Sequence, residues 1–356
     1  MKIALLGDIA LFGCNNRDVN FQVKFKEIRN YLSKFNCVIG NLETPLTNEV
    51  QFIGGKSAYI KGRPADVEIL KYLGVTHVSL ANNHMFDFCE KGLEDTKEIL
   101  SKAEISWYGV QGKIEKIIRD DTRIVLHGYC CYSTNGKGMG DYIDVFDPVK
   151  VEHDIIKDKS AGYLPILSIH WGQEHVHYPN YDHVLISRKL ALQSPIVIHG
   201  HHPHVIQGIE SIGQSIIAYS LGNFCFDDIY TNKSVQPLIK LSDANKEVMI
   251  LGIEIIGNEV KNIEIKYFVF SKEFYKEASY IENKAIMWNE FLKKGKEEYI
   301  KIRDKELREY IEERKRKRDL HWYLKRMNAE SIRMIVASHG NLKQYNRLIR
   351  NYIKER

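Results

Sequence analysis

The sequence predicts an α/β protein in which a mixed sheet, or two packed sheets, precedes a C-terminal helical extension. Short β-rich runs alternate with helical stretches up to residue 270, which is the pattern of buried strands joined by crossover helices. A tight turn at Gly257-Asn258 joins two strands as an antiparallel pair, so the sheet is not purely parallel. From residue 271 the β pattern stops and helical spacing replaces it. We therefore divide the chain into residues 1–270 and a helical extension, 271–356.

The predicted strands are apolar runs rich in β-branched residues. They cover residues 2–7, 37–41, 77–81, 106–110, 123–129, 164–170, 196–199, 215–220, 248–256 and 263–270. Two crossover helices are predicted between them. Residues 64–73 start with Pro64 at a first helical position and end before Gly74. Residues 92–103 place apolar side chains at helical spacing.

The extension predicts amphipathic helices. Apolar residues recur at helical spacing in two sets, which are Leu320, Tyr323, Leu324 and Met327, then Leu342, Tyr345, Ile349 and Tyr352. The segment 338–341, which contains Gly340, predicts a break between the last two helices. Residues 312–318, two glutamates followed by five basic residues, predict a charged helix surface.

The charge of the chain is unevenly distributed. The composition, with 44% hydrophobic and 27% charged residues, is that of a globular protein and excludes disordered, collagen-like and disulfide-scaffold classes. The net charge of +5 combines two opposite parts. Residues 271–356 hold 23 Lys and Arg against 14 Asp and Glu, a net +9, and residues 1–270 hold 28 against 32, a net −4.

The sequence predicts a cytoplasmic protein. No apolar run approaches the roughly 20 residues that span a bilayer, and residues 3–6 are too short for the core of a signal peptide. The six cysteines form no C-x-x-C pair, so we expect them to be reduced thiols, as in a reducing compartment.

Histidines supply the strongest functional signal. Of 14 in the chain, eight lie between residues 170 and 204, and four of these occur in segment 198–204, directly after an apolar strand. Imidazoles grouped where a strand ends are typical ligands of zinc, manganese or iron. Isolated histidines would instead be surface or hydrogen-bonded core residues. The clustering favours a metal site.

Other predicted strands also end in polar side chains. These are Asp8 after the first strand, Asn41 and Glu43 after the second, and Asn83 and His84 after the third. Alone, Asp8 would be an ordinary cap and Asn83 an ordinary turn former. Their recurrence at strand ends predicts one shared site, because the carboxyl ends of neighbouring parallel strands meet at one edge.

The ordered motifs resemble the bacterial capsule synthesis family, known as CapA or the poly-γ-glutamate capsule proteins. They cover residues 1 to about 228 and read Gly7-Asp8, Asn41-Leu42-Glu43, Ala81-Asn82-Asn83-His84 with Asp87, His170-Trp171-Gly172 with Glu174, Gly200-His201-His202-Pro203-His204 with Gln207, and Tyr219-Ser220-Leu221-Gly222-Asn223-Phe224. That family is similar in turn to the calcineurin-like metallophosphoesterases. The resemblance implies a sandwich of two mixed sheets flanked by helices, with two divalent ions, manganese, iron or zinc, at the carboxyl ends of the strands.

The resemblance also implies roles for individual residues. Asp8 and His204 match ligands of a first metal, and Glu43 stands in the place of a bridging aspartate. Asn83, His170 and His202 match ligands of a second metal. His84 resembles the histidine that protonates the leaving oxygen, and Asp87, three residues later, is a candidate to orient its ring.

The sequence departs from the metallophosphoesterase pattern at two positions. Ala10 stands where those enzymes carry a ligand histidine, and Glu43 replaces an aspartate. Possible substitute ligands are Asn41, Glu174, His201 and Asn223. Lys56, Lys61 and Arg63 lie in a stretch that begins at Gly54-Gly55 and are candidates to bind an anionic substrate, with a solvated loop as the alternative.

The leading functional hypothesis is a metal-dependent hydrolase that acts on a phosphate ester or a related anionic substrate in capsule or surface-polymer metabolism. Two divalent ions activate water and neutralise charge on a phosphoryl group. One alternative is a metal-dependent γ-glutamyl amide hydrolase or transferase, and another is a non-catalytic accessory subunit of poly-γ-glutamate or capsule synthesis. The basic extension could dock on a capsule-synthesis partner or an anionic membrane surface. Glutamates interleaved in 306–313 argue against nucleic acid.

Overall fold

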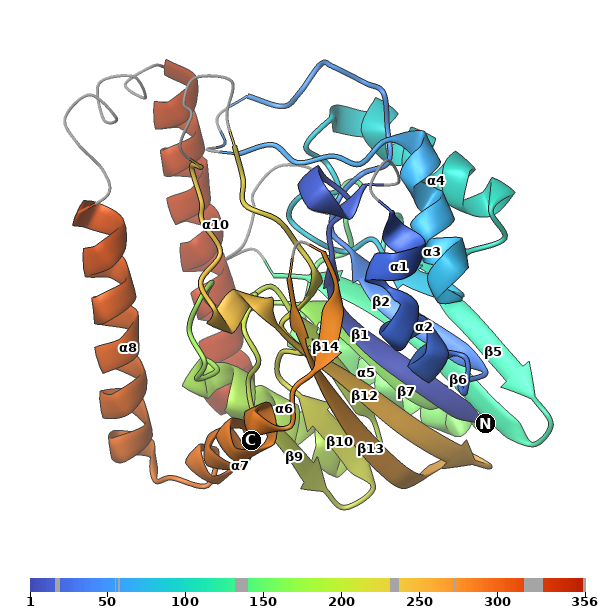
Figure 1. Cartoon of the computed structure of the whole chain (residues 1–356). Helices are drawn as coiled ribbons and strands as arrows, with labels where there is room; N and C mark the ends of the chain where they lie inside the picture. Colours follow the sequence, from blue (N-terminus) through green and yellow to red (C-terminus); the bar gives the residue numbers. More distant parts are fainter. Residues whose placement is uncertain are drawn as a thin grey trace.

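Two β-sheets pack face to face, and helices cover their outer faces, in the computed structural model of the chain (Figure 1). The structure describes residues 1–356 except 17–19, 55, 57, 132–139, 231–236, 272, 317–328 and 355–356. The two mixed sheets flanked by helices that the family resemblance implies are confirmed.

The first sheet has eight strands in the order β14-β13-β12-β1-β2-β3-β4, and β11 pairs with the end of β1. Strands β1 to β4 are parallel to one another, and β12 to β14 continue the sheet in antiparallel pairs. Their bounds are β1 (Lys2–Ile9), β2 (Cys37–Leu42), β3 (His77–Ser79), β4 (Ser106–Tyr108), β11 (Asn223–Cys225), β12 (Glu247–Ile256), β13 (Glu259–Phe270) and β14 (Tyr275–Glu277).

The second sheet has six strands in the order β5-β6-β7-β8-β10-β9. Strands β6, β7, β8 and β10 are parallel, with an antiparallel strand at each edge. Their bounds are β5 (Glu115–Arg119), β6 (Thr122–Cys130), β7 (Leu164–His170), β8 (Val197–His201), β9 (Ile209–Ile212) and β10 (Ser215–Ala218). Apolar side chains of both sheets, among them Leu5, Ile166 and Leu251, form a buried core between them.

Helices cover the outer face of each sheet. Those on the first sheet are α1 (Phe21–Lys24), α2 (Lys26–Leu32), α3 (Val67–Leu73) and α4 (Cys89–Lys102). The second sheet carries α5 (Pro148–Ser160) and α6 (Tyr181–Gln193). The C-terminal helices are α7 (Tyr280–Phe291), α8 (Lys296–Arg316) and α10 (Ala329–Lys354), and short 3₁₀ turns are at Gly13–Asn15, Pro64–Asp66 and Ala244–Lys246. No helix in the described part of the chain is long and apolar enough to cross a membrane.

Most predicted elements are confirmed. Every predicted strand coincides with an observed one, both crossover helices are present, and Gly257, at a φ of 60°, forms the predicted turn between β12 and β13. Strands β5, β9, β11 and β14 were not predicted. The prediction that β structure ends at residue 271 was wrong, because β14 adds an antiparallel edge strand to β13.

The predicted helix break at residues 338–341 was also wrong. Helix α10 continues through this segment. Glycine inside a helix costs only about 1 kcal/mol relative to alanine, which the burial of Tyr345, Ile349 and Tyr352 further along the helix outweighs. The predicted helix around Leu320 to Met327 lies outside the described residues. The charged surface of 312–318 is observed on α8 as far as Arg316.

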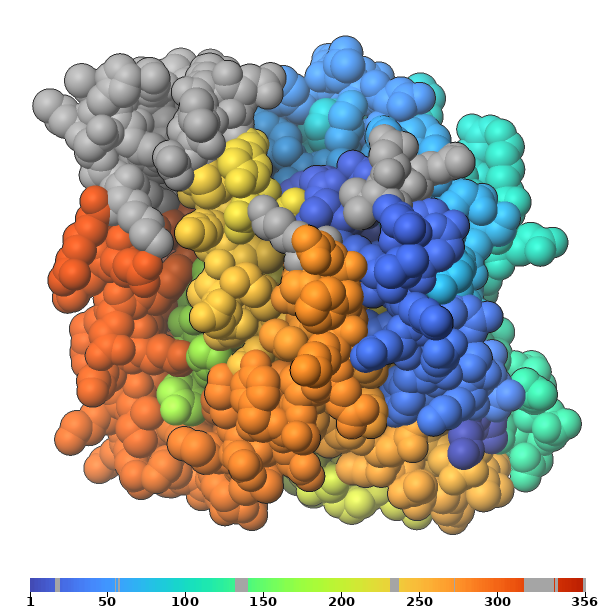
Figure 2. Space-filling view, in the orientation of Figure 1, coloured from blue at the N-terminus to red at the C-terminus, as the bar shows by residue number. Residues whose placement is uncertain are grey.

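The C-terminal helices share buried side chains with the rest of the chain. Trp288 of α7 packs in the core between the sheets, whereas Tyr299 of α8 and Tyr345 of α10 pack against residues of α6. In the space-filling view the orange and red segments lie directly against the green and yellow ones (Figure 2). The division of the chain at residue 270 remains a prediction. Because the C-terminal helices share a core with the rest of the chain, a truncation experiment is needed to test it.

Candidate metal centre

The polar residues predicted from strand ends gather at one edge of the sandwich. Asp8 lies near the end of β1, Glu43 directly follows β2, and His170 ends β7. Two glycines allow this convergence. A Cβ on Gly7 would lie 2.0 Å from the Gly222 carbonyl oxygen, and one on Gly200 would lie 1.9 Å from that of Tyr219. Only glycine permits such close contact between neighbouring backbones.

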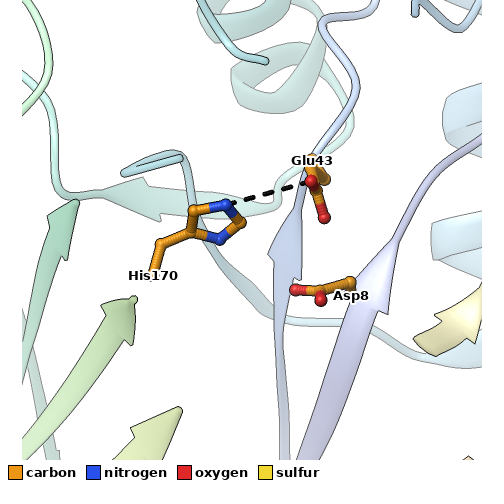
Figure 3. A group of neighbouring side chains, drawn as sticks. All are labelled: Asp8, Glu43 and His170. Carbon is orange, nitrogen blue, oxygen red and sulfur yellow. Dashed lines mark ion pairs between the residues drawn. The ribbon is translucent and has the colours of Figure 1, made fainter. Parts of the chain in front are cut away.

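Asp8, Glu43 and His170 form a buried group in which one potential ligand atom of each residue lies within 4.8 Å of the others (Figure 3). The two carboxylates come from the first sheet and the imidazole from the second. Glu43 Oε1 lies 3.9 Å from His170 Nε2 and 3.6 Å from His204 Nε2, distances too long for hydrogen bonds. Both carboxylate oxygens of Glu43 are buried without a hydrogen-bond partner in the described structure.

Asp8 is surrounded by donors. Its Oδ1 accepts a hydrogen bond from Asn41 Nδ2 at 2.8 Å, and its Oδ2 accepts one from the His202 backbone N–H at 3.2 Å. His201 Nδ1 and His204 Nδ1 lie 3.3 Å and 3.4 Å from its two oxygens. Burial alone would raise the pKa of Asp8, but these two imidazoles outweigh burial and hold the pKa well below its usual value.

His170 joins the second group of predicted ligands. Its Nε2 lies 3.0 Å from Asn83 Oδ1 and 3.0 Å from His202 Nδ1. Burial, followed by the neighbouring His202, holds the pKa of His170 well below its usual value. Burial likewise lowers the pKa of His202, to about 4. Neutral imidazoles of this kind have nitrogen lone pairs that can bind a metal ion.

His204 connects the first group to β11. Its Nδ1 lies 2.9 Å from Asn223 Oδ1, a predicted substitute ligand. Burial would lower the pKa of His204, but the carboxylates of Glu43, Asp8 and Glu174 raise it to about 10. The backbone is strained here, since His202 and His204 have φ values of 96° and 57°, a region that non-glycine residues rarely adopt. Such strain often occurs at functional sites.

His84 and Asp87 form a separate pair beside this group. His84 Nδ1 lies 2.7 Å from Asp87 Oδ2, and the His84 backbone N–H donates to Asn82 Oδ1 at 3.1 Å. Lys56 Nζ lies 2.5 Å from Asp87 Oδ1 and also contacts the backbone carbonyl of Asn83. Burial would raise the pKa of Asp87, but Lys56 and His84 outweigh it and lower the pKa, so this carboxylate is ionised at neutral pH.

The other predicted residues lie in different surroundings. Lys61 Nζ donates to the carbonyl oxygen of Glu49, and Arg63 pairs with Asp66 at 3.0 Å. Both therefore make local contacts, whereas Lys56 reaches the site. Ala10, at the position of a metallophosphoesterase histidine, is fully buried in an apolar cluster with Phe226.

Several residues at the site were not predicted. Asn82 donates to Asn41 Oδ1 at 3.2 Å, and Asn245 donates to the carbonyl oxygen of His204 at 2.8 Å. Tyr310 and Arg314 of α8 approach Glu174. Asn82 lies within a motif and could have been found. The others are far away in sequence and carry no local signal.

The residues present fit divalent metal ions. Buried polar atoms normally have hydrogen-bond partners, and the exceptions here are the two oxygens of Glu43 and both ring nitrogens of His201. Carboxylate, imidazole and amide groups together form the donor set of a transition-metal site. The ions would lie among Asp8, Glu43, Asn83 and the clustered histidines.

Comparison with known proteins supports the resemblance seen in the motifs. Residues 2–228 match the family described as Bacterial capsule synthesis protein PGA_cap. The chain belongs to this capsule synthesis family. The match includes every predicted ligand and ends shortly after β11, so β12 to β14 and the C-terminal helices lie outside it.

Relatives of this PGA_cap family member carry capsule, PGA or polyglutamine names. It is 24% identical over 311 residues to the capsule biosynthesis protein CapA of Bacillus anthracis, covering 82% of this chain and 74% of that protein. It is 27% identical over 216 residues to the PGA biosynthesis protein CapA of Bacillus subtilis, covering 57% and 56%. It is also 27% identical over 213 residues to a probable polyglutamine synthesis accessory protein of Mycobacterium tuberculosis. That match covers 54% of this chain and 55% of that protein. The chain thus spans little more than half of the last two relatives.

Among solved structures, a hypothetical protein from Thermus thermophilus is 12% identical and superposes with a TM-score of 0.47, covering 76% of this chain and all of that one.

Proposed function

We propose that this protein is a metal-dependent hydrolase that acts on a phosphate ester or a related anionic substrate in capsule or surface-polymer synthesis. The observation that carries this proposal is the carboxylate of Glu43, buried and without hydrogen-bond partners between His170 and His204. An ionised carboxylate in this position is costly unless a cation compensates it. Without a metal ion, burial outweighs the opposing effect of His204 and raises the pKa of Glu43 well above its usual value.

The side chains divide into holding and proton-transfer roles. Bound divalent ions would supply Lewis-acid stabilisation and an activated water. Two such ions, manganese, iron or zinc, would be held by Asp8, Glu43, Asn83, His170, His202 and His204. His84 would act as the general acid, because Asp87 occupies its Nδ1 and leaves Nε2 to give a proton to the leaving group. Lys56 keeps Asp87 ionised and so supports the orientation of this ring.

A second candidate is hydrolysis or transfer of a γ-glutamyl amide. The capsule and PGA names of the Bacillus relatives favour it, because poly-γ-glutamate is a polyanion linked by amides. The same residues would serve, with His84 protonating a departing amine. The names also support a third candidate, a non-catalytic accessory role in a capsule-synthesis assembly, in which the basic C-terminal helices would contact the partner or a membrane surface.

One experiment separates the three candidates. Purified protein loaded with Mn²⁺ is assayed on phosphomonoesters, phosphodiesters and γ-glutamyl peptides, in the wild type, in His84→Ala and in the matched surface variant His153→Ala, whose side chain is 79% exposed. The proposal predicts phosphoester cleavage that falls about 100-fold in His84→Ala with unchanged metal content. Cleavage of γ-glutamyl bonds alone would establish the second candidate. No cleavage by metal-loaded protein would establish the accessory role.

A further inference from the structure

Helix α8, which lies beyond the family-matched region, packs against the loop that follows His170. Glu306, Tyr310 and Arg314 are spaced by four residues and therefore share one face of the helix. Glu306 accepts a hydrogen bond from the His177 backbone N–H at 3.1 Å, and its Oε1 lies 2.7 Å from His177 Nδ1. The ring of Tyr310 lies 5.2 Å from that of His175. One face of the extension is thus docked on this loop.

The same loop is also tied to the metal centre. The His175 backbone N–H donates to the carbonyl oxygen of Pro203 at 2.8 Å. Its Nδ1 lies 3.0 Å from Asn245 Nδ2, which donates to the carbonyl oxygen of His204. His175 has a φ of 61°, so these contacts hold a strained backbone. The loop therefore lies between α8 and the ligand histidines.

Glu174 lies where the two sets of contacts meet. Tyr310 OH approaches its Oε2 at 3.5 Å, and a guanidinium nitrogen of Arg314 lies 3.9 Å from the same oxygen. Burial would raise the pKa of Glu174, but His202, His175, His204 and Arg314 outweigh burial and lower it to about 2. The carboxylate thus interacts with the ligand imidazoles and with the extension.

We propose that Arg314 is a specificity-determining residue that binds an oxyanion, carboxylate or phosphate, of a substrate held at the metal centre. Its side chain is 43% exposed, and its ion pair with Glu174 is longer than a hydrogen bond, so its planar N–H donors can pair with an arriving oxyanion. Lys56 is a weaker candidate for binding the oxyanion, because its ammonium group already pairs with Asp87. The inference rests on the proposed function and assigns part of the substrate recognition to the basic extension.

Binding measurements test this role without requiring turnover. The full chain loaded with Mn²⁺ is titrated with two probes, a fluorescently labelled oligo-γ-glutamate followed by anisotropy and inorganic phosphate followed by calorimetry. The variants are Arg314→Ala, Arg314→Lys and, as matched control, Arg308→Ala, which removes an exposed arginine from the same helix. Metal content and thermal midpoint are measured for each variant, so that a folding defect is recognised.

We expect Arg314→Ala to weaken the binding of one probe about tenfold, with partial retention in Arg314→Lys and less than a twofold change in Arg308→Ala. Weaker binding of the oligo-γ-glutamate identifies a polymer carboxylate, and weaker binding of phosphate identifies a phosphoryl group. Equal effects of Arg314→Ala and Arg308→Ala, or no binding of either probe to the wild type, would overturn the role of Arg314. Binding that depends on Arg314 in a protein that cleaves nothing would refute the hydrolase and retain this inference.

Discussion

His84 Nδ1 lies 2.7 Å from Asp87 Oδ2, and both residues belong to the short segment that follows β3. The Asp87 carboxylate is fully buried. It also forms an ion pair with Lys56 and accepts a hydrogen bond from the backbone N–H of Ile60. This arrangement fixes the ring of His84 beside the candidate metal centre. Orientation of a histidine by a buried carboxylate is a common feature of general acids and bases.

Asp87→Asn should therefore slow turnover while the metal stays bound. We expect kcat to fall by about tenfold or more with little change in KM, because the amide holds the imidazole less well and supports its protonated form less. Asp121→Asn, which makes the same change at an exposed carboxylate in the turn between β5 and β6, is the matched control. Equal kcat values for wild type and Asp87→Asn, measured under saturating substrate, would remove Asp87 from the mechanism.

Glu43→Gln should change the response of stability to metal. In metal-free protein the buried carboxylate has no hydrogen-bond partner, so the neutral amide should be at least as stable as the wild type. Added Mn²⁺ should raise the thermal midpoint of the wild type by several degrees and leave that of Glu43→Gln nearly unchanged. Thermal unfolding with EDTA and then with Mn²⁺ checks this. Equal metal-induced shifts in both proteins would show that Glu43 is not a ligand.

The extension should be needed for stability. Tyr345 of α10 is 5% exposed and packs against α6, so Tyr345→Ala should lower the free energy of unfolding by roughly 3 kcal/mol. Val336→Ala, at a 67% exposed position of the same helix, should have almost no effect. Chemical denaturation measures both.

A chain truncated after residue 270 should be insoluble, and a soluble, metal-binding truncation would instead establish the extension as a separate domain.

Acid should destabilise the protein partly through His183. Burial, followed by the nearby Arg303, lowers the pKa of this histidine to about 3 in the folded state, against about 6.5 in an unfolded chain. Between these values the unfolded chain binds the extra proton, so stability falls with decreasing pH by up to about 1.4 kcal/mol per unit. Denaturation at pH 7 and pH 5 should show a smaller loss for His183→Asn than for the wild type. An identical loss in both proteins would exclude this contribution.

Strands that are buried on both faces could be predicted from sequence alone. Strands β1 and β7 are largely apolar runs, and the polar residues at their ends, Asp8 and His170, pointed to the candidate metal centre. Short edge strands such as β14 carry no such run and form only because a neighbouring strand offers free backbone groups. The helix break near Gly340 was predicted from local propensity, which tertiary packing of α10 overrides.

The contribution of α8 to the site could not be predicted from sequence. Arg314 lies in a run of charged residues whose pattern is that of a solvated helix face, and only the fold brings it to Glu174. The motif residues could be predicted, because their ordered spacing matches a known family. The site is therefore predictable where it is built from strand ends and not where a distant helix completes it.

We propose that Glu43 binds metal at the buried group that it forms with Asp8 and His170. Anomalous diffraction from crystals soaked with Mn²⁺ tests it most directly. We predict an anomalous peak within coordinating distance of a carboxylate oxygen of Glu43 and of His170 Nε2, since carboxylate and imidazole groups are usual ligands of such ions. Crystals that show manganese only at surface carboxylates, with none between these three side chains, would rule out metal binding by Glu43.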